Sequence, residues 1–430
     1  MTLLWWCYDL LVCLGAFCYL PVYAVRGKWH RGLLMRLGRW PAAITARLDG
    51  RPTLWIHAVS VGEALAARPF VEALRAAHPQ YQLVFSTVTA TGQHVASRFL
   101  SPNDLLLYWP LDLSAVLCGA LDRVRPRALI VLESELWPNA LRCCQERRIP
   151  VIVINGRISE RSLRRYRRVP WLARWLMQHL RLALMQTEED ARRAQALGLE
   201  AAHVRVTGNL KFDGAAPKAA AGDLSTLRHQ LGLADEAWLL IGGSTHPGEE
   251  RLLLDLYGQL RQEWPGARLL LAPRHVERAD EIETLARSAG HAVLRHSQCD
   301  GAAAPPAGTP IILLDTIGHL RDLYPLATIV VIGGSFVAHG GQNPLEASAA
   351  GKATVFGPHM FNFREVAEQL VAAQAAAQVP DGPALLATCR LWLRQPQQRE
   401  AVGARARALV EQQRGATQRT LQAVAEAIPL

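Results

Sequence analysis

The chain has 430 residues, of which 50% are hydrophobic and 20% charged, so it can bury a core and is not intrinsically disordered. At about 100–200 residues per domain, this length indicates two or three domains. The surplus of 47 Lys and Arg over 37 Asp and Glu gives a net charge of +10, which favours an anionic partner: nucleic acid, an anionic lipid surface or a phosphorylated substrate.

The first element is an apolar segment at residues 3–25, which is long enough to span a bilayer and contains a single charge, Asp9. Its Trp and Tyr residues are typical of a membrane interface. The flank that follows carries six Lys and Arg residues before its first acid, Asp49, so the positive-inside rule predicts a cytoplasmic flank. We therefore expect a membrane anchor here. The pattern leaves open whether the segment spans the bilayer, lies in the interface or is a buried helix.

Cysteine usage indicates a reducing compartment. Of the eight cysteines, three lie in this apolar segment and five are scattered without a C-x-x-C pair, so neither a disulfide framework nor a zinc site is indicated. Histidines such as His339 and His359 lack partners at metal-ligand spacing, and no metal is expected.

From residue 53 onward, short apolar runs alternate with segments of helical spacing such as residues 63–77 and 138–147. Seven runs are expected to be strands: residues 53–61, 82–89, 105–110, 128–133, 151–156, 182–187 and 204–210. Strands of this buried type, separated by helices, predict a parallel sheet with helices on both faces.

A second series follows residues 212–223, which are rich in Gly, Ala, Pro and Lys and typical of a linker. Six further runs are expected to be strands: residues 238–244, 267–273, 291–296, 311–315, 327–335 and 353–358. Residues 301–308 are expected to form an exposed loop, and the tail from about residue 397 to be helical. Two doubly wound halves predict a ligand in the cleft between them, at the carboxyl ends of the strands.

Two acidic motifs follow strands of the first half. Ser60 and Glu63 have the spacing of a helix capping box, but Glu63 would also lie at the carboxyl end of a strand, where it could be a general base. Glu133 and Glu135 end another strand, and one of them could be functional while the other is a first-turn residue. Lys211, at the linker, is either a solvated hinge charge or a cation that meets a phosphate.

Glycine-rich turns follow strands of the second half. The turn at residues 241–249 lacks both the P-loop and the dinucleotide fingerprint, so it is a tight turn or an anion site. Arg274 ends another strand, as an exposed charge or a phosphate ligand. Asn343, Pro344 and Glu346 have a capping-box pattern. The glycine pairs before them favour a phosphate at this helix start, with Glu346 accepting hydrogen bonds from ribose hydroxyls.

A run of arginines between Arg157 and Arg168 forms a basic patch in the first half. A nucleic-acid reader would combine such a patch with a recognised binding fold, and none is visible. We therefore expect a solvated face or a contact with anionic lipid or phosphate, and no nucleic-acid partner.

Together, nine segments resemble the 3-deoxy-D-manno-octulosonic acid (Kdo) transferase family of lipopolysaccharide synthesis. They occur in the family's order over nearly the whole chain: HAVSVGE (57–63), STVTATG (86–92), ESELWPN (133–139), NGRISERS (155–162), TGNLKFD (207–213), GGSTHPGEE (242–250), APRHVER (272–278), GGSFVAHGGQNPLEASAAG (333–351) and GPHMFNF (357–363). Each segment alone is weak evidence for this family, but nine segments in the family's order are specific evidence. They favour a functional role for these motifs over simple helix capping.

The resemblance implies an α/β chain of GT-B glycosyltransferase architecture, in which two Rossmann-like domains face each other across a cleft. A membrane anchor at residues 1–25 would precede an acceptor domain at 26–212, a linker at 213–223, and a donor domain at 224–430 that ends in a helical tail. The implied enzyme is inverting and metal-independent, and it needs no cofactor. It would move Kdo from CMP-Kdo to a phosphorylated lipid A precursor, lipid IVA, on the anionic cytoplasmic face of the inner membrane. The number of Kdo units and the oligomeric state stay open.

Matched residue by residue, the family's pattern makes Glu63 the base that activates the acceptor hydroxyl and gives Glu133 and Lys211 a role in supporting the transition state. The implied CMP site comprises Pro273, Arg274, Ile317, Gly318, His319, Asn343, Pro344, Leu345 and Glu346. The family usually has Glu where this chain has His319. A backbone contact to the nucleotide would survive that change, whereas a side-chain contact would differ.

The sequence leaves two alternative functions open. Another GT-B transferase or a nucleotide-sugar epimerase would use a uridine nucleotide. A non-catalytic, membrane-anchored scaffold with a degenerate nucleotide fold would not transfer Kdo, although the retained Glu63, Glu133, Lys211 and Arg274 argue against it.

Overall fold

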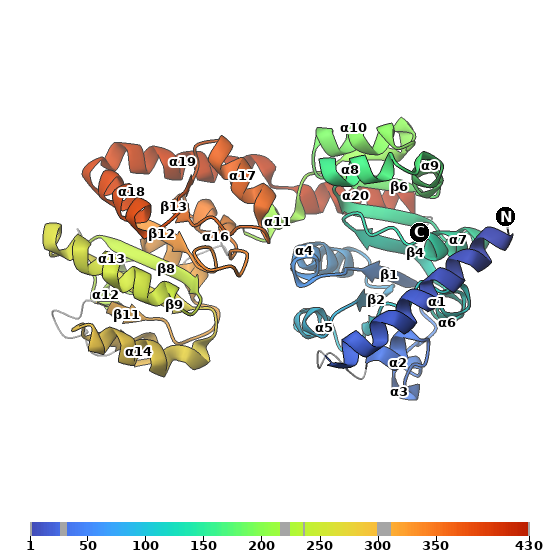
Figure 1. Cartoon of the computed structure of the whole chain (residues 1–430), viewed down its shortest axis with the longest axis horizontal. Coiled ribbons are helices and arrows are strands. Elements are labelled where there is room, and N and C mark those ends of the chain that lie inside the picture. The colour runs from blue at the N-terminus through green and yellow to red at the C-terminus, as the bar shows by residue number, and fades with distance from the viewer. Residues whose placement is uncertain (1, 26–31, 216–223, 235–236, 299–310, 429–430) are drawn as a thin grey trace. The chain divides into compact units, whose positions relative to one another are not determined.

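The computed structural model describes residues 2–25, 32–215, 224–234, 237–298 and 311–428 (Figure 1). The chain forms two compact units: unit 1 comprises Met1–Gly214 and Arg414–Leu430, and unit 2 comprises Ala215–Gln413. Each unit has its own parallel sheet covered by helices, so the expected pair of α/β domains is confirmed.

Unit 1 is built on a seven-stranded sheet with the order β3-β2-β1-β4-β5-β6-β7, in which every pairing is parallel. Its strands are β1 (Thr53–His57), β2 (Gln82–Thr87), β3 (Leu105–Tyr108), β4 (Pro126–Leu132), β5 (Val151–Gly156), β6 (Leu182–Met185) and β7 (Val204–Val206). All seven were predicted from their apolar runs. The runs at residues 53–61 and 204–210 overshoot because their last residues form loops and helix starts.

Helices cover both faces of this sheet. They are α1 (Thr2–Val25), α2 (Gly32–Arg36), α3 (Ala42–Thr45), α4 (Val61–Ala77), α5 (Ala90–Ala96), α6 (Ser114–Val124), α7 (Pro138–Glu146), α8 (Glu160–Tyr166), α9 (Pro170–Gln178), α10 (Glu188–Ala196), α11 (Leu210–Asp213) and α20 (Ala416–Ala427). Successive strand residues face opposite sides. Trp55 therefore packs in the core with α6, α7, α9 and α10, and its neighbour Ile56 packs in the core with α4 and α20.

The C-terminal boundary differs from the expected one. The donor domain was expected to reach residue 430, but α20 belongs to unit 1, where it lies beside α4 and β6 (Figure 1). Leu421 and Val424 of α20 are buried in the core that α4 shares. The Asp213 carboxylate accepts hydrogen bonds from the backbone N–H groups of Gly415 and Thr417, at 2.7 and 2.5 Å. Helical periodicity predicts that a helix has a buried face, but it does not say which core buries it.

Unit 2 has a second seven-stranded parallel sheet, with the order β10-β11-β9-β8-β12-β13-β14. Its strands are β8 (Leu239–Thr245), β9 (Arg268–Pro273), β10 (Val293–Arg295), β11 (Ile311–Leu313), β12 (Ile329–Ile332), β13 (Ala353–Phe356) and β14 (Ala377–Gln378). Six were predicted. The sequence missed β14, because its two residues are too few to show a strand pattern.

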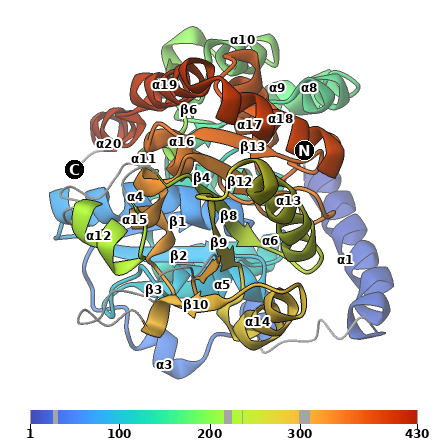
Figure 2. The same cartoon turned by 90° about the vertical axis from the view of Figure 1, so that its left-hand side faces the viewer.

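The helices of unit 2 are α12 (Leu224–Gln230), α13 (Glu249–Glu263), α14 (Ala279–Ser288), α15 (Leu320–Leu323), α16 (Leu345–Ala349), α17 (Arg364–Ala372), α18 (Gly382–Arg394) and α19 (Pro396–Gln413). Apolar residues of α13, α14 and α18 share one core with the sheet, and Figure 2 shows α13 and α14 flanking its strands. The expected loop at residues 301–308 and most of the expected linker lie outside the described residues.

Helix α1 packs on unit 1 through polar and aromatic contacts. Asp9 Oδ1 accepts hydrogen bonds from the Ser114 N–H at 3.1 Å and from Asn139 Nδ2 at 2.7 Å, and the Tyr8 hydroxyl donates to Asp112 at 2.7 Å. These contacts explain the single charge in the apolar segment. The opposite side is exposed and apolar, with Trp6, Leu10, Leu14 and Phe17. Within the described residues, we find no helix whose length and apolar character suffice for a membrane crossing.

Candidate active site

The predicted site residues of unit 1 lie where its sheet changes winding direction. The strand order reverses between β1 and β4, so the loops that leave these neighbouring strands diverge and open a crevice at their carboxyl ends. Glu63 is in the first turn of α4, after β1, and Glu133 directly follows β4. Two carboxylates that are far apart in the sequence therefore share one edge of the sheet.

Glu63 forms the capping box and is also a perturbed acid. The Ser60 Oγ accepts from the Glu63 N–H at 3.2 Å, and the Glu63 carboxylate accepts from the Val59 N–H at 2.7 Å and from the Ser60 hydroxyl at 3.0 Å. Burial, followed by the negative charge of Glu133, raises the pKa of Glu63 to about 7. The structural and functional interpretations of this motif are thus compatible, because the cap fixes the orientation of the carboxyl group.

Glu133 and Lys211 come together as predicted site residues. Lys211 Nζ lies 3.5 Å from Glu133 Oε1, and both side chains are about one-fifth exposed (19% and 22%). Glu133 has a left-handed backbone, with φ at 56°, a conformation that costs a non-glycine residue energy and recurs at functional sites. The neighbouring Glu135 has a raised pKa because of burial and the charge of Glu133.

A buried amide network, which sequence reasoning missed, positions Lys211. Asn155 Oδ1 accepts from the Leu210 N–H at 3.0 Å, and Asn209 Oδ1 accepts from the Lys211 N–H at 3.0 Å. Gln186 Oε1 accepts from Asn209 Nδ2 at 2.8 Å. Asn155 and Asn209 stand in the NGRISERS and TGNLKFD segments, so their places at strand ends were the available signal.

In unit 2 the strand order reverses between β8 and β12, and the glycine-rich turns follow these two strands. The buried carboxylate of Glu249 connects the two turns. It accepts backbone N–H groups from His246 (2.9 Å), Gly334 (2.6 Å), Ser335 (3.0 Å) and Phe336 (2.9 Å). Because the two turns are about 85 residues apart, no local pattern predicts that Glu249 organises both of them.

Arg274 lies beside a cluster of histidines. The Arg274 side chain is exposed, and the backbone N–H of Arg274 donates to the Thr245 carbonyl at 2.9 Å. The His246 ring stacks on His339 at 4.3 Å and is 6.2 Å from His275. Burial, and then the charges of these two histidines and Arg274, lower the pKa of His246 to about 4, so it is neutral at physiological pH. Its Nε2 lies 3.0 Å from Gln342 Nε2, which can donate to the neutral ring.

Of the remaining predicted CMP residues, Pro273 ends β9. The others lie in the turn before α15 and at the start of α16. Ile317 is 76% exposed, Gly318 has a φ of 96°, and His319 precedes α15 with its ring 5.1 Å from that of His296. Burial raises the pKa of Glu346, and the charges of Arg321 and Asp322, which lie just beyond His319 in the sequence, act on the same carboxyl group.

The helix start at residue 343 differs from the predicted capping box. Asn343 Oδ1 accepts from the Leu345 N–H at 3.0 Å, but α16 begins at Leu345 with Pro344 as its N-cap. Pro344 and Leu345 are buried, whereas Glu346 is partly exposed. Among the described residues, the Glu346 carboxyl group therefore does not cap α16, and it stays available to a ligand.

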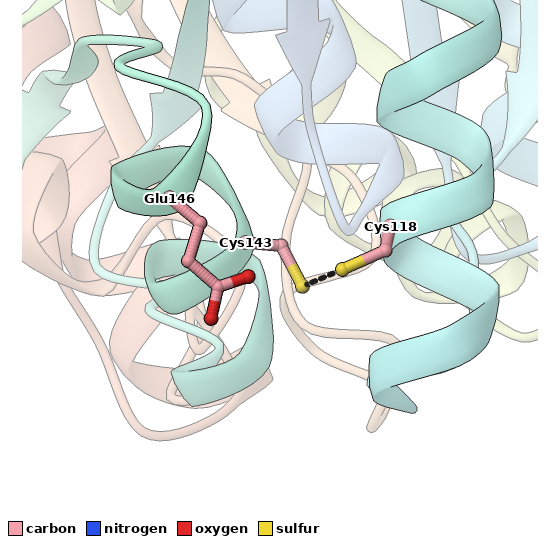
Figure 3. Close-up of side chains that lie close together, drawn as sticks. All are labelled: Cys118, Cys143 and Glu146. Carbon is pink, nitrogen blue, oxygen red and sulfur yellow. Dashed lines mark hydrogen bonds between the residues drawn. The ribbon is translucent and has the colours of Figure 1, made fainter.

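Folding also brings together Cys118 of α6 and Cys143 of α7, whose sulfur atoms are 2.6 Å apart beside Glu146 (Figure 3). The three potential ligand atoms lie within 4.8 Å of one another. However, Glu146 accepts from Arg142 at 2.5 Å, and Arg147 donates to the Cys118 sulfur at 3.3 Å. Two guanidinium groups at the cluster disfavour a further cation, so these residues do not fit a divalent metal. Burial raises the pKa of the Cys143 thiol.

The chain is similar in sequence and in fold to known proteins. A family model described as 3-deoxy-D-manno-octulosonic-acid transferase matches residues 31–214. The chain is 35% identical over 411 residues to the 3-deoxy-D-manno-octulosonic acid transferase of Bordetella pertussis, covering 93% of this chain and 92% of that protein. It is 31% identical to the transferase of the same name from Haemophilus influenzae, covering 96% and 95%. In fold it is similar to the crystal structure of Acinetobacter baumannii MurG, with a TM-score of 0.56, 14% identity, and coverage of 87% and 99%.

Proposed function

Because the chain belongs to the Kdo transferase family, and is thereby a glycosyltransferase that transfers Kdo in lipopolysaccharide core synthesis, we propose that its donor is CMP-Kdo and its acceptor is a phosphorylated lipid A precursor. The geometry of unit 1 supports a single displacement with inversion at the anomeric carbon. In that reaction the acceptor hydroxyl attacks the anomeric carbon, its proton passes to a base, and the bond between this carbon and the CMP phosphate breaks.

The observation that carries this proposal is the state of Glu63. A carboxyl group with a pKa near 7 is partly ionised at neutral pH and basic enough to take a proton from a hydroxyl. Its hydrogen bonds from Val59 and Ser60 hold it in one orientation. We assign Glu63 as the base. A correctly placed base contributes typically 10²–10⁴-fold in rate.

Lys211 supplies positive charge for the transition state. Glu133 holds its ammonium group at 3.5 Å, and the amide network fixes its backbone, so the charge is in place before the reaction begins. Preorganised charge of this kind stabilises the negative charge that develops during transfer. Glu133 thus acts in our proposal through Lys211 and through its effect on the pKa of Glu63.

In unit 2 we assign CMP to the turns after β8, β9 and β12. The exposed Arg274 guanidinium would bind its phosphate, and Glu346 the ribose hydroxyls. The neutral His246 ring offers a hydrogen bond without adding charge. We propose that no divalent metal takes part, since Lys211 and Arg274 supply positive charge. Treatment with EDTA should leave the rate unchanged, and a loss restored by Mg²⁺ would contradict this.

We further propose that the exposed apolar side of α1 lies in the membrane interface on the cytoplasmic side. Support comes from its exposed Trp6, Leu10, Leu14 and Phe17 and from the basic flank that follows in the sequence. Replacing Leu10 and Phe17 with Gln should reduce sedimentation with anionic vesicles while leaving Kdo transfer to detergent-solubilised acceptor unchanged. Equal sedimentation of both proteins would contradict the assignment.

The direct test of the reaction is mass spectrometry of a mixture containing the enzyme, CMP-Kdo and tetraacylated lipid A precursor. The proposal predicts one or more additions of Kdo to the acceptor, and CMP, rather than a uridine nucleotide, should raise the melting temperature. No addition, together with stabilisation by a uridine nucleotide alone, would favour an epimerase or another GT-B transferase. No addition and no nucleotide effect would favour a non-catalytic scaffold.

A further inference from the structure

A pocket of about 780 Å³ opens at the edge of the unit 2 sheet that is opposite the proposed CMP turns, and its volume is typical of small-molecule sites. Its lining includes the residues that immediately precede four strands: Trp238 before β8, Ala267 before β9, Thr328 before β12 and Lys352 before β13. The proposed CMP turns follow β8, β9 and β12 instead. Because these strands are parallel, the seven residues of β8, at about 3.3 Å each, place the pocket about 20 Å from those turns.

Two cations that line this pocket are withdrawn from water without a close carboxylate. The Arg399 side chain is only 15% exposed, and among the described residues it contacts the Trp392 carbonyl at 3.4 Å and forms a long ion pair, of 3.6 Å, with Glu400. Lys352 is half-buried, and its ammonium group has no hydrogen bond or ion pair with a described residue. Withdrawing a charge from water is costly unless the charge is paired, so both positions favour a bound anion.

A third cation lies close to these two. Arg228 lines the same pocket, and its guanidinium group donates to the Ala234 carbonyl. Burial, and then the positive charges of Arg399 and Arg228, lower the pKa of Lys352. The three cations therefore repel one another in the free protein, and an anion between them would relieve that repulsion.

The rest of the described lining leaves this positive charge in excess. Glu263 already pairs with two arginines of α18, at 2.6 and 2.7 Å, and Glu400 is 73% exposed. The indole rings of Trp238 and Trp264, with centroids 5.3 Å apart, form an apolar part of the wall. Apolar walls lower the local dielectric constant, which strengthens the attraction between the cations and an anion.

We propose that this pocket binds a small molecule that carries a diphosphate group, with Lys352, Arg399 and Arg228 contacting its phosphate oxygens. An anion with a single charge would leave two of the three cations without a counter-charge. A diphosphate carries more than one charge and presents oxygens on two phosphorus atoms, so it can contact all three. The site contains no residue of the proposed CMP site, and the two can be occupied at the same time.

The test is titration calorimetry of the full chain in detergent, with inorganic pyrophosphate as the probe. All measurements use an Arg274→Met background, which removes the phosphate-binding cation of the proposed CMP site. Lys352→Met and Lys352→Arg are then compared in that background. Arg287→Met is the control for lost surface charge, because Arg287 does not line the pocket, is 59% exposed and pairs with Glu283 on α14. Thermal unfolding reports whether each variant is folded.

We expect the background protein to bind pyrophosphate, and to bind inorganic phosphate more weakly. Lys352→Met should weaken pyrophosphate binding by about 10-fold or more, which matches a lost charge-assisted hydrogen bond. Lys352→Arg should retain most of the affinity, and Arg287→Met all of it. The inference would be overturned if the background protein did not bind pyrophosphate, if it bound phosphate equally tightly, or if Lys352→Met left the affinity unchanged. An equal loss in Lys352→Met and Arg287→Met would overturn it as well.

Discussion

The ammonium group of Lys211 lies 3.5 Å from a carboxylate oxygen of Glu133, although 78 residues separate them in the sequence. Glu133 ends β4 with a left-handed backbone, and Lys211 is held on α11 by Asn209. The carboxylate in turn helps to raise the pKa of Glu63 to about 7. One ion pair therefore links the proposed source of positive charge to the proposed base.

Glu63→Gln should abolish most transfer without unfolding the protein. The amide keeps an oxygen that can accept from the Val59 N–H, but it cannot take a proton from the acceptor. We expect kcat/KM to fall by about 10²–10⁴-fold while the melting shift caused by CMP stays at its wild-type value. Transfer by the variant at a rate close to that of the wild type would show that another group is the base.

The wild-type rate should depend on pH through the same group. Since the base must be ionised to act, kcat/KM should rise with pH and level off above about 7, the pKa of Glu63. The residual rate of Glu63→Gln should lack this step. A wild-type profile that is flat between pH 5 and pH 8 would contradict the assignment of Glu63.

Stability should change in the opposite direction with pH. The folded pKa of Glu63 is above its unfolded value of 4.5, so the folded state holds a proton that the unfolded state has lost between pH 4.5 and pH 7. The stabilisation is complete below pH 4.5 and is lost as pH rises through 7. Relative to the wild type, Glu63→Gln should gain on the order of 3 kcal/mol between pH 4.5 and pH 8. Unfolding measured at both pH values, with the difference between the two proteins taken at each, provides the check.

Lys211→Met should lower kcat more than it raises the KM for either substrate, because the charge is used in the transition state. We expect kcat to fall by about 10²-fold. Lys211→Arg should recover part of this loss, because it keeps the positive charge but spreads it over a planar guanidinium group. Stopped-flow or discontinuous assays at saturating substrate would separate kcat from KM. A pure KM effect would instead make Lys211 a binding residue.

Glu249→Ala should weaken unit 2 and its response to CMP. The substitution leaves four backbone N–H groups, three of them in buried hydrogen bonds, without their acceptor, and we expect a loss of about 3–5 kcal/mol in stability. Glu263→Ala, at the other end of α13, is the control, since its ion pairs with Arg390 and Arg394 are at the surface, where solvent screens them, and should contribute little to stability. Equal losses in the two variants would show that Glu249 has no special role.

Much of the architecture follows from local pattern. Apolar runs of buried strand type predicted thirteen strands in two series, and the helical intervals between them predicted two parallel α/β sheets. The places where pattern failed are those where local signals are short or ambiguous. β14 has only two residues, and the Asn343 motif resembled a capping box although its helix begins later.

The candidate site was only partly predictable. Glu63, Glu133 and Lys211 could be proposed because each stands at a strand end within a family motif. The pairing of Glu133 with Lys211, the anchoring role of Glu249 and the meeting of Cys118 with Cys143 could not, since each joins segments that are distant in the sequence. The shifted pKa of Glu63 likewise requires knowledge of burial and of its neighbouring charges.

The sequence by itself determined the number and class of the domains, the strand ends that carry the chemistry, and the family, because apolar periodicity and ordered motifs are local properties of the chain. Only the tertiary structure decided that α20 completes unit 1, that Asp9 attaches α1 to α6 and α7, and that Lys352 and Arg399 line the same pocket. These are contacts between distant segments. They depend on which surfaces the folded core brings within a few ångströms, and no local pattern encodes that.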